Sequence, residues 1–583
     1  MAVLLNKFVG IIVIALSGCF WSLQAGYGAI NEGYLCRSQQ LISEADTSKY
    51  LQAVEEFAQN VLQNGRDTYG DEHSPLFADG IHIRTGEPVR WEAENESWII
   101  SNFGSQQNLM RVLVGLSGLT GNYKYRKAAA EAVEYMYEHQ SDSSGLLYWG
   151  GHQFVDLQTM ENQFKGRPHE LKNNFPFYEF MWKVDSVHTR KMLRAMWNAH
   201  ILKWSNLDLN RHGEYNMEMN HLWDHEFSQP PSFFPGDGLT FINAGTDMIQ
   251  AALTLYALGD EEGAKKWGVR LYHQYVKARN PETRLGVYQY SKPEQKELPP
   301  EDGPLTGELT FSNYGDRAKN QFSKVYGDVA LEGNVLWGSR MQTLYGKSPV
   351  MILHLAEQLE QTETGDTLLK WTLEGLRAYI DHAYVPSENH FKPMWADGTD
   401  LSGHTLPRTG YYGEKGTPFK PVKPSGEMLL AVAKAVRMSD GDKVLWRGMR
   451  HLFLGEQLGD PGADLKAEPE LNFDTEVADA GMLVTVLEMY KATKNPQYLK
   501  LAEIIGENIL KYKFHQGYFI ISDRHKYVRF DIPEPLALLM LEEVLQGKSG
   551  LVPPYLTGFG STDGEPQKNG RPSDEETYDE TFD

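Results

Sequence analysis

The chain has 583 residues and a formal net charge of −22, with 56 Lys and Arg against 78 Asp and Glu. Its 41% hydrophobic and 23% charged residues are typical of a globular protein and exclude a disordered or fibrous one. The net negative charge argues against nucleic acid as a partner, because binding its phosphates needs a basic surface. The 12% aromatic share indicates a large core, and aromatic rings also offer flat faces on which sugars stack.

The N-terminus has the pattern of an export signal. Lys7 precedes an apolar run, residues 8–16, that is too short to span a bilayer. The run ends in Leu16-Ser17-Gly18-Cys19, which resembles the lipobox of bacterial lipoproteins. We therefore predict a lipoprotein-type signal peptide at 1–18 and an acylated Cys19, with ordinary cleavage after Ala25 as the alternative.

The segment 19–46 would then be a tether to a lipid anchor. We expect a periplasmic protein held at the outer membrane through Cys19, with no other membrane contact. Cys19 and Cys36 are the two cysteines, too few for a disulfide framework, and there is no C-x-x-C pair for zinc or redox chemistry.

From 47 to 547 apolar residues recur at helical spacing. In 47–62 they fall at Tyr50, Val54, Phe57 and Val61, after Thr47 or Ser48 as a cap. The same period predicts helices at 105–117, 123–139, 193–204, 247–258, 262–277, 350–361, 366–381, 425–437, 443–454, 474–491, 496–511 and 534–545.

Many of these helices meet at a glycine followed by Asn or Asp: Gly121-Asn122, Gly259-Asp260, Gly365-Asp366 and Gly441-Asp442. Glycine ends one helix in the left-handed conformation and the next side chain caps the following helix. The unequal spacing of these turns excludes a solenoid. We predict an all-α fold, an α/α toroid at 47–547, in which loop and short-strand insertions form the active-site cleft.

The insertions lie at 141–187, 205–240 and 279–347 and are rich in Gly, Pro, Trp, Tyr and His. After Gly547 the helical period ends, and residues 548–583 carry three basic and eight acidic side chains. This composition predicts a disordered acidic tail.

Candidate metal ligands occur in loop segments between Trp149 and Glu214. His152, Glu170 and His212 offer two imidazoles and a carboxylate, which suit a divalent transition metal. Alternatively, each histidine hydrogen-bonds a backbone carbonyl and Glu170 caps a helix.

A second candidate is the pair His221 and His225, four residues apart and followed by Glu226. On a helix the two imidazoles would share a face. Pro230 and Pro231 leave a helix little length there, so we favour packing or loop hydrogen bonds for this pair.

Five longer motifs together resemble one family. They are P-L-F-A-D-G at 75–80, G-E-P-V-R-W at 86–91, I-S-N-F-G-S-Q-Q-N-L at 100–109, W-G-G-H-Q-F at 149–154 and W-S-N-L-D-L-N-R-H-G-E-Y at 204–215. Over about 47–545 the chain resembles polysaccharide lyase family 2, the periplasmic pectate lyases. Neither the lipobox nor the acidic tail belongs to the family pattern.

The resemblance implies an α/α toroid that cleaves polygalacturonate or oligogalacturonides by β-elimination. It implies a divalent transition metal, Mn²⁺ first and Ni²⁺ or Co²⁺ as others, bound by His152, Glu170 and His212. It also implies that Arg211, directly before the second histidine ligand, is the catalytic base. From its chemistry alone, Arg211 would instead clamp a substrate carboxylate. We expect a monomer.

A polyanionic substrate also needs a basic groove on this acidic protein. The motif-bearing segments supply candidates for its lining: Arg111, Lys172, Arg190, Arg194 and Arg211.

Two other functions remain open from the residues. A glycoside hydrolase on the same fold needs two carboxylic side chains and no metal, for which Glu179, Asp185 and Asp237 are available. A glycan-binding surface lipoprotein would suit the lipobox, but the concentration of His, Glu and Arg in loops favours an enzyme.

Overall fold

The computed structural model describes residues 48–164, 166–219, 221–310, 315–557 and 570–581. The predicted signal peptide, Cys19 and the tether 19–46 lie outside these residues. Helices dominate the described chain, so the predicted helical fold is confirmed. They are α2 (Lys49–Asn64), α3 (Gln107–Thr120), α4 (Tyr123–His139), α5 (Tyr178–Val184), α6 (Ser186–His200), α7 (Ile242–Gly259), α8 (Glu262–Lys277), α9 (Arg317–Tyr326), α10 (Ser339–Gln342), α11 (Ser348–Gln358), α12 (Glu363–Ala383), α13 (Gly426–Met438), α14 (Lys443–Gly455), α15 (Ala480–Thr493), α16 (Pro496–Lys513) and α17 (Glu534–Leu545).

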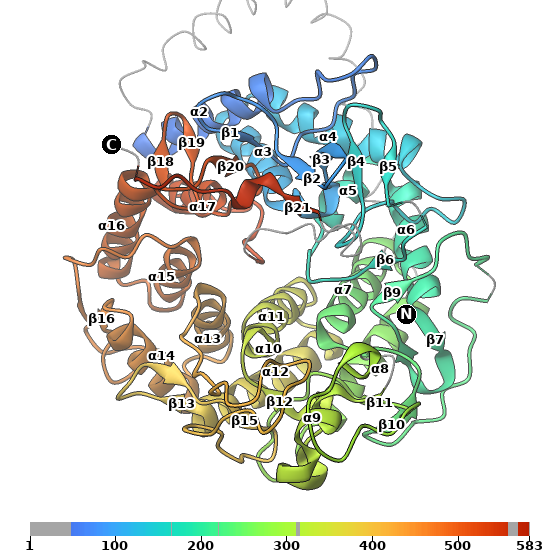
Figure 1. The fold of residues 1–583 in the computed structure, drawn as a ribbon. Coiled ribbons are helices and arrows are strands. Elements are labelled where there is room, and N and C mark those ends of the chain that lie inside the picture. The colour runs from blue at the N-terminus through green and yellow to red at the C-terminus, as the bar shows by residue number, and fades with distance from the viewer. Residues whose placement is uncertain (1–47, 165, 220, 311–314, 558–569, 582–583) are drawn as a thin grey trace, which may run out of the picture.

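The helices form a closed ring of pairs (Figure 1). Consecutive helices pack against each other as α3 with α4, α5 with α6, α7 with α8, α11 with α12, α13 with α14, and α15 with α16. Helices α7, α13, α15 and α17 are buried over nearly their whole surface, as expected of inner helices. The last inner helix, α17, packs on α2 and α3, so α2, the first helix of the described residues, completes the final pair and closes the ring.

Two of the four predicted turns behave as expected. Gly121 has φ +72° and Asn122 caps α4, and likewise Gly441 has φ +79° and Asp442 caps α14. Two predictions were wrong. Asp260, not Gly259, takes the left-handed conformation, and Gly365 lies inside α12, whose cap is Thr362.

The helix predicted at 193–204 is also shifted. Asp185 accepts hydrogen bonds from the backbone N–H of Val187 and His188, so α6 begins at Ser186 and ends at His200. Residues 201–203 then form a strand and residues 204–206 a short 3-10 helix, so the apolar period that continues to Trp204 does not extend the α-helix.

Short strands occupy the insertions and one face of the ring. They are β1 (Gly80–His82), β2 (Arg90–Glu92), β3 (Ser97–Ser101), β4 (Phe154–Asp156), β5 (Asn162–Gln163), β6 (His169–Glu170), β7 (Ile201–Lys203), β8 (Asp208–Leu209), β9 (His212–Gly213), β10 (Phe234–Gly236), β11 (Ser291–Pro293), β12 (Val335–Leu336), β13 (Tyr384–Val385), β14 (His390–Phe391), β15 (Met394–Trp395), β16 (Gly459–Asp460), β17 (Glu470–Leu471), β18 (Phe514–His515), β19 (Tyr518–Phe519), β20 (Tyr527–Arg529) and β21 (Arg571–Pro572). The largest sheet has the order β21-β2-β3-β4-β5, so chain ends far apart in sequence meet in it.

The C-terminal residues differ from the predicted disordered tail. Tyr555 and Leu556 are buried, and β21 pairs antiparallel with β2. Asp574 forms an ion pair with Arg529 at 2.6 Å, with both side chains largely buried. The prediction of disorder is therefore wrong for residues 548–557 and 570–581, because the edge of β2 and Arg529 give this acidic segment specific partners.

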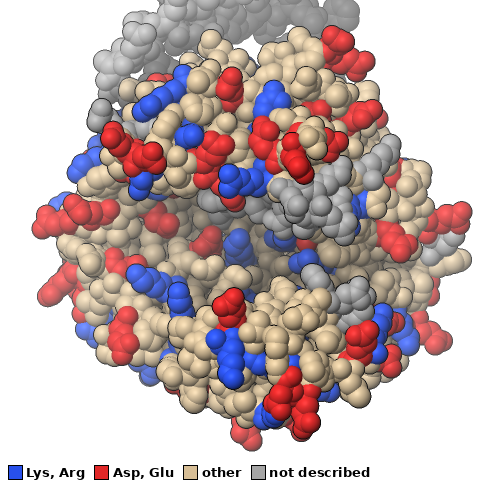
Figure 2. Space-filling model, viewed as in Figure 1, with Lys and Arg blue, Asp and Glu red and all other residues tan. Residues whose placement is uncertain are grey.

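Viewed along the ring axis, the molecule has a hollow at its centre (Figure 2). Lys and Arg side chains gather in this hollow, whereas many Asp and Glu side chains lie around the rim of the same face. Within the described ranges, no helix combines the length and apolar character needed to cross a membrane.

Candidate metal centre

Two short strands bring a carboxylate and an imidazole together. β6 pairs antiparallel with β9, and Glu170 lies directly opposite His212 in this register. Side chains at opposite positions of an antiparallel pair are direct neighbours. The loop before β4 adds His152, because Gly150 forms a parallel bridge with Glu170.

Two glycines allow this loop to approach Glu170. Gly150 has φ +112°, a conformation that other residues rarely adopt. A Cβ on Gly151 would lie 1.8 Å from Oε2 of Glu170, a contact that no other residue could accommodate without movement. The Gly-Gly pair before His152 therefore places its imidazole beside the carboxylate.

The three side chains form a cluster that fits a metal ion. One ligand atom from each of His152, Glu170 and His212 lies within 4.8 Å of the others. The histidine Nε2 atoms are 3.4 Å and 3.5 Å from the Glu170 oxygens. Both Glu170 oxygens and Nε2 of His212 are buried yet make no hydrogen bond, which is costly unless another partner is present. Two imidazoles and a carboxylate suit a divalent transition metal.

The cluster lies in a cationic setting. Nη2 of Arg211 is 3.3 Å from Oε1 of Glu170, and Nζ of Lys172 is 3.6 Å from Oε2. Burial alone would raise the pKa of Glu170, but His212, Arg211, Lys172 and His152 together hold it well below its usual value. Glu170 is therefore ionised and available as an anionic ligand.

A hydrogen-bond chain supports the ligand strands from behind. Nε1 of Trp149 donates to Nε2 of His169 at 2.7 Å, so His169 carries its proton on Nδ1 and donates it to Nε2 of His200 at 2.8 Å. Nδ1 of His200 then donates to the carbonyl of Asn210 at 2.7 Å. Burial lowers the pKa of His169 well below its usual value and that of His200 to about 4, consistent with two neutral rings.

This hydrogen-bond chain was not predicted from the amino-acid sequence. His169 stood next to a recognised candidate, and His200 lay within a predicted helix, so neither position signalled a partner for the other. The backbone N–H of His212 donates to Oδ1 of Asn210 at 3.1 Å, which links the chain to the ligand strand. We therefore regard His169 and His200 as positioning residues.

Three of the five predicted basic residues lie elsewhere. Arg111 is fully buried and donates to the carbonyl of Phe175 at 2.6 Å, and burial lowers its pKa to about 10. Arg190 and Arg194 both pair with Glu261, the residue before α8. Only Lys172 and Arg211 of the predicted lining lie at the cluster.

The alternative sites have structural roles. His225 stacks on Trp204, with ring centres 4.6 Å apart, and His221 has a positive φ, which is incompatible with a shared helix. Asp185 is the cap of α6, and Oε1 of Glu179 accepts a hydrogen bond from Gln358. These carboxylates are used in packing and give no support to a hydrolase pair.

The chain has weak similarity to several solved structures. A solved cellobiose 2-epimerase from Bacillus thermoamylovorans B4167 is 10% identical, covering 84% of this chain and 99% of that one at a TM-score of 0.37. A D-mannose isomerase is 12% identical, covering 86% and 98% at a TM-score of 0.39.

The sequence relatives are much closer. The chain is 36% identical over 534 residues to a pectate disaccharide-lyase of Dickeya dadantii (strain 3937), covering 90% of this chain and 94% of that protein. The family model described as periplasmic pectate lyase matches residues 74–565, which include the whole cluster. The chain therefore belongs to the periplasmic pectate lyase family.

Proposed function

We propose that this protein cleaves polygalacturonate or oligogalacturonides by metal-dependent β-elimination. The observation that supports this most strongly is the buried Glu170 carboxylate with two imidazoles and Arg211 around it, in a chain of the periplasmic pectate lyase family. His152, Glu170 and His212 are the proposed ligands and Arg211 the proposed base. Mn²⁺ is the proposed metal, with Ni²⁺ or Co²⁺ as substitutes.

The proposed architecture is an α/α toroid whose insertions form the active-site cleft. The closed ring of helix pairs and the central hollow support it (Figures 1 and 2). The protein is proposed to act in the periplasm as a monomer anchored through an acylated Cys19. A mass spectrum of the membrane fraction tests the anchor, and a free N-terminus at Gly26 contradicts it.

In this mechanism the residues of the site have separate roles. His152, Glu170 and His212 would hold a divalent cation, which would supply positive charge to offset the uronate carboxylate and the charge that develops on it. Arg211 takes the C5 proton of the sugar. The C4–O bond then breaks as the C4–C5 double bond forms, and the departing glycosidic oxygen acquires a proton to give the second product. Lys172 contributes positive charge beside the substrate carboxylate.

The test is to mix purified protein with polygalacturonate and follow the ultraviolet absorbance of the unsaturated product. We expect absorbance to rise, to stop with a chelator, and to return when Mn²⁺ is added in excess. New reducing ends without absorbance would indicate a hydrolase and overturn the proposal. The similarity to a pectate disaccharide-lyase of Dickeya supports an unsaturated disaccharide as product, which sizing of the products would check.

A further inference from the structure

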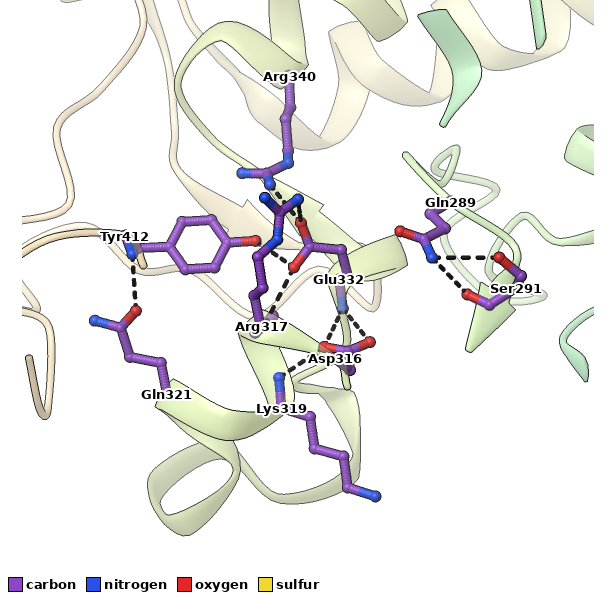
Figure 3. A network of polar contacts seen from close by, with 10 residues as sticks. Gln289, Ser291, Asp316, Arg317, Lys319, Gln321, Glu332, Arg340 and Tyr412 are labelled. Carbon is purple, nitrogen blue, oxygen red and sulfur yellow. Dashed lines mark hydrogen bonds and ion pairs between the residues drawn. The ribbon is translucent and has the colours of Figure 1, made fainter. Parts of the chain in front are cut away.

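A second group of arginines lies near the metal centre, in the insertion between α8 and α11. Arg317 begins α9, Glu332 precedes β12, and Arg340 lies in α10 (Figure 3). The Glu332 carboxylate accepts hydrogen bonds from Arg317, from Nη2 of Arg340 at 2.5 Å and from the Tyr412 hydroxyl at 2.8 Å. Three separate segments thus converge on the carboxylate of a fourth.

The network holds two guanidinium groups against one fully buried carboxylate. Burial alone would raise the pKa of Glu332, but Arg340 and Arg317 lower it, so Glu332 is ionised. Asp316 is used differently, since its oxygens accept the backbone N–H groups of Glu332 and Lys319 at 2.8 Å. The buried Nε atoms of Arg317 and Arg340 have no hydrogen-bond partner. Positive charge and donor capacity therefore exceed what Glu332 satisfies.

The ring of Phe241 connects this network to the proposed base. The guanidinium carbon of Arg211 is 5.8 Å from the centre of that ring, and the guanidinium carbon of Arg317 is 5.6 Å from the same centre. The guanidinium carbon of Arg317 also lies 3.8 Å from the centre of the Tyr411 ring. Tyr411 is 46% exposed, so the stack that begins beside the metal centre reaches solvent.

We propose that Arg317 binds a second carboxylate of the substrate, on a sugar unit neighbouring the one held at the metal centre. This inference rests on the proposed function. A polyuronate carries one carboxylate on each sugar, and a planar guanidinium held in one orientation is suited to binding it. Glu332 is the positioning residue, because it fixes Arg317 and Arg340. Methyl esterification removes the charge that Arg317 recognises, so this residue selects free uronate over its ester.

Arg317→Gln tests the proposal. We expect KM for polygalacturonate to rise about 10- to 100-fold, the effect of losing a charge-assisted contact, with kcat largely retained. We also expect the wild-type preference for polygalacturonate over methyl-esterified pectin, measured as a ratio of kcat/KM values, to fall. Metal content, measured by elemental analysis, should not change, because Arg317 contacts none of the ligands.

Arg529→Gln is the matched control. Arg529 is another largely buried arginine in an ion pair, with Asp574, and its loss should lower thermal stability without changing KM or the preference for free uronate. If Arg317→Gln behaves like this control, Arg317 is only structural and the proposal is wrong. A wild-type protein that makes no unsaturated product would instead refute the proposed function.

Tyr411→Ala provides a second test if Arg317→Gln does not fold. Removing this exposed ring leaves the core intact but takes away a stacking contact that holds the Arg317 guanidinium in one orientation. We expect a KM several-fold higher and a weaker preference for free uronate. An unchanged KM and preference in this variant would overturn the proposal.

Discussion

Arg211 is the residue on which the proposed chemistry depends. Its Nη2 atom lies 3.3 Å from Oε1 of Glu170, and its side chain is 28% exposed, so it can reach both the ligand cluster and a bound substrate. A free guanidinium stays protonated far above neutral pH, so a base acting through its small neutral fraction gives a rate that rises with pH. A clamp stays charged and gives no such rise from its own titration.

We predict that Arg211→Ala is inactive but still binds metal and oligogalacturonate. Arg211→Lys should keep some activity, with the pH profile moved towards neutral, because a free lysine titrates near 10. Turnover measured against pH, together with calorimetric substrate binding, checks both expectations. Near-normal turnover with weakened binding in Arg211→Ala would show that Arg211 is a clamp.

Gly151 leaves no room for a side chain beside Glu170. Alanine at this position puts a methyl carbon 1.8 Å from Oε2 of Glu170, so either the loop or the ligand must move. We expect Gly151→Ala to lose at least about 10-fold in metal affinity, the usual cost of disturbing support for a ligand. Metal titration followed by elemental analysis measures it.

Gly86→Ala is the control for this change. Gly86 also has a positive φ, +73°, which strains any other residue, but nothing lies within 4 Å of the added Cβ. It should lose a little stability and keep full metal affinity. Equal metal affinity in the two variants would mean that the close approach of the loop to Glu170 is not required.

At the scale of helices and strands, amphipathic period and capping predicted most of the ring. Ser48 caps α2 as expected, because its hydroxyl accepts the N–H of Leu51. The sequence did not indicate that α17 pairs with α2, since no local pattern records contacts between the two chain ends. It also missed α5, seven residues long and placed inside an insertion, where short length weakens any periodic signal.

Residue type and loop placement made the metal cluster one candidate among several, and the family motifs were needed to select it, because its residues come from three separate segments. The pairing of β6 with β9 brings two of them together, and strands of two residues carry no alternation that would predict it. The Arg317, Glu332 and Arg340 network was missed for a similar reason. Charged residues are abundant in this chain, and only the fold shows which of them share a buried site.

Inner helices are joined by a buried ion network that gives a prediction about acid stability. Glu488 of α15 pairs with Arg437 of α13 at 2.6 Å and with Lys491 at 2.9 Å. Burial alone would raise the pKa of Glu488, but Lys434, Lys491 and Arg437 lower it to about 2. Because the pKa of Glu488 is lower in the folded protein than its unfolded value of 4.5, the ionised carboxylate stabilises the fold fully at pH values above 4.5. This stability is lost as the pH falls towards 2.

Glu488→Gln should therefore be less stable at pH 7, by on the order of 3 kcal/mol, because buried cations lose their partner. The difference in Tm between variant and wild type should shrink as the pH falls below about 4.5. Glu262→Gln is the control, since Glu262 is 71% exposed in its pair with Lys265 and should change neither value. A Tm difference independent of pH would contradict the assigned ionisation of Glu488.

For the whole molecule, the distribution of charge matters more than the total. The chain carries −22, yet Lys and Arg gather in the central hollow (Figure 2). Lys172, Arg211 and Arg317 belong to the two sites described above, each beside a buried glutamate that holds it in place. An acidic protein can thus offer a local cationic surface to a polyanion.

The C-terminal segment 571–578 holds the two ends of the described chain together. Residues 571–578 lie beyond the part that the family model matches, yet they join the N-terminal β2 to the C-terminal β20. The Ser573 hydroxyl accepts the N–H of Arg90, and Asp574 neutralises Arg529 in a largely buried pair. Removing this segment leaves the edge of β2 unpaired and Arg529 without its carboxylate.

We expect a chain truncated before Gly570 to fold and bind metal but to melt a few degrees lower, the shift expected for a loss of one or two kcal/mol. Asp574→Asn should reproduce much of this decrease by itself, because it removes the charge while keeping the strand. Glu580→Gln, at an exposed position of the same segment, should leave Tm unchanged. Scanning calorimetry of these three variants and of the wild type measures the Tm differences. If the truncated chain melts with the wild type, the segment is not part of the cooperative fold, and the pairing of β21 with β2 contributes nothing to closure of the ring.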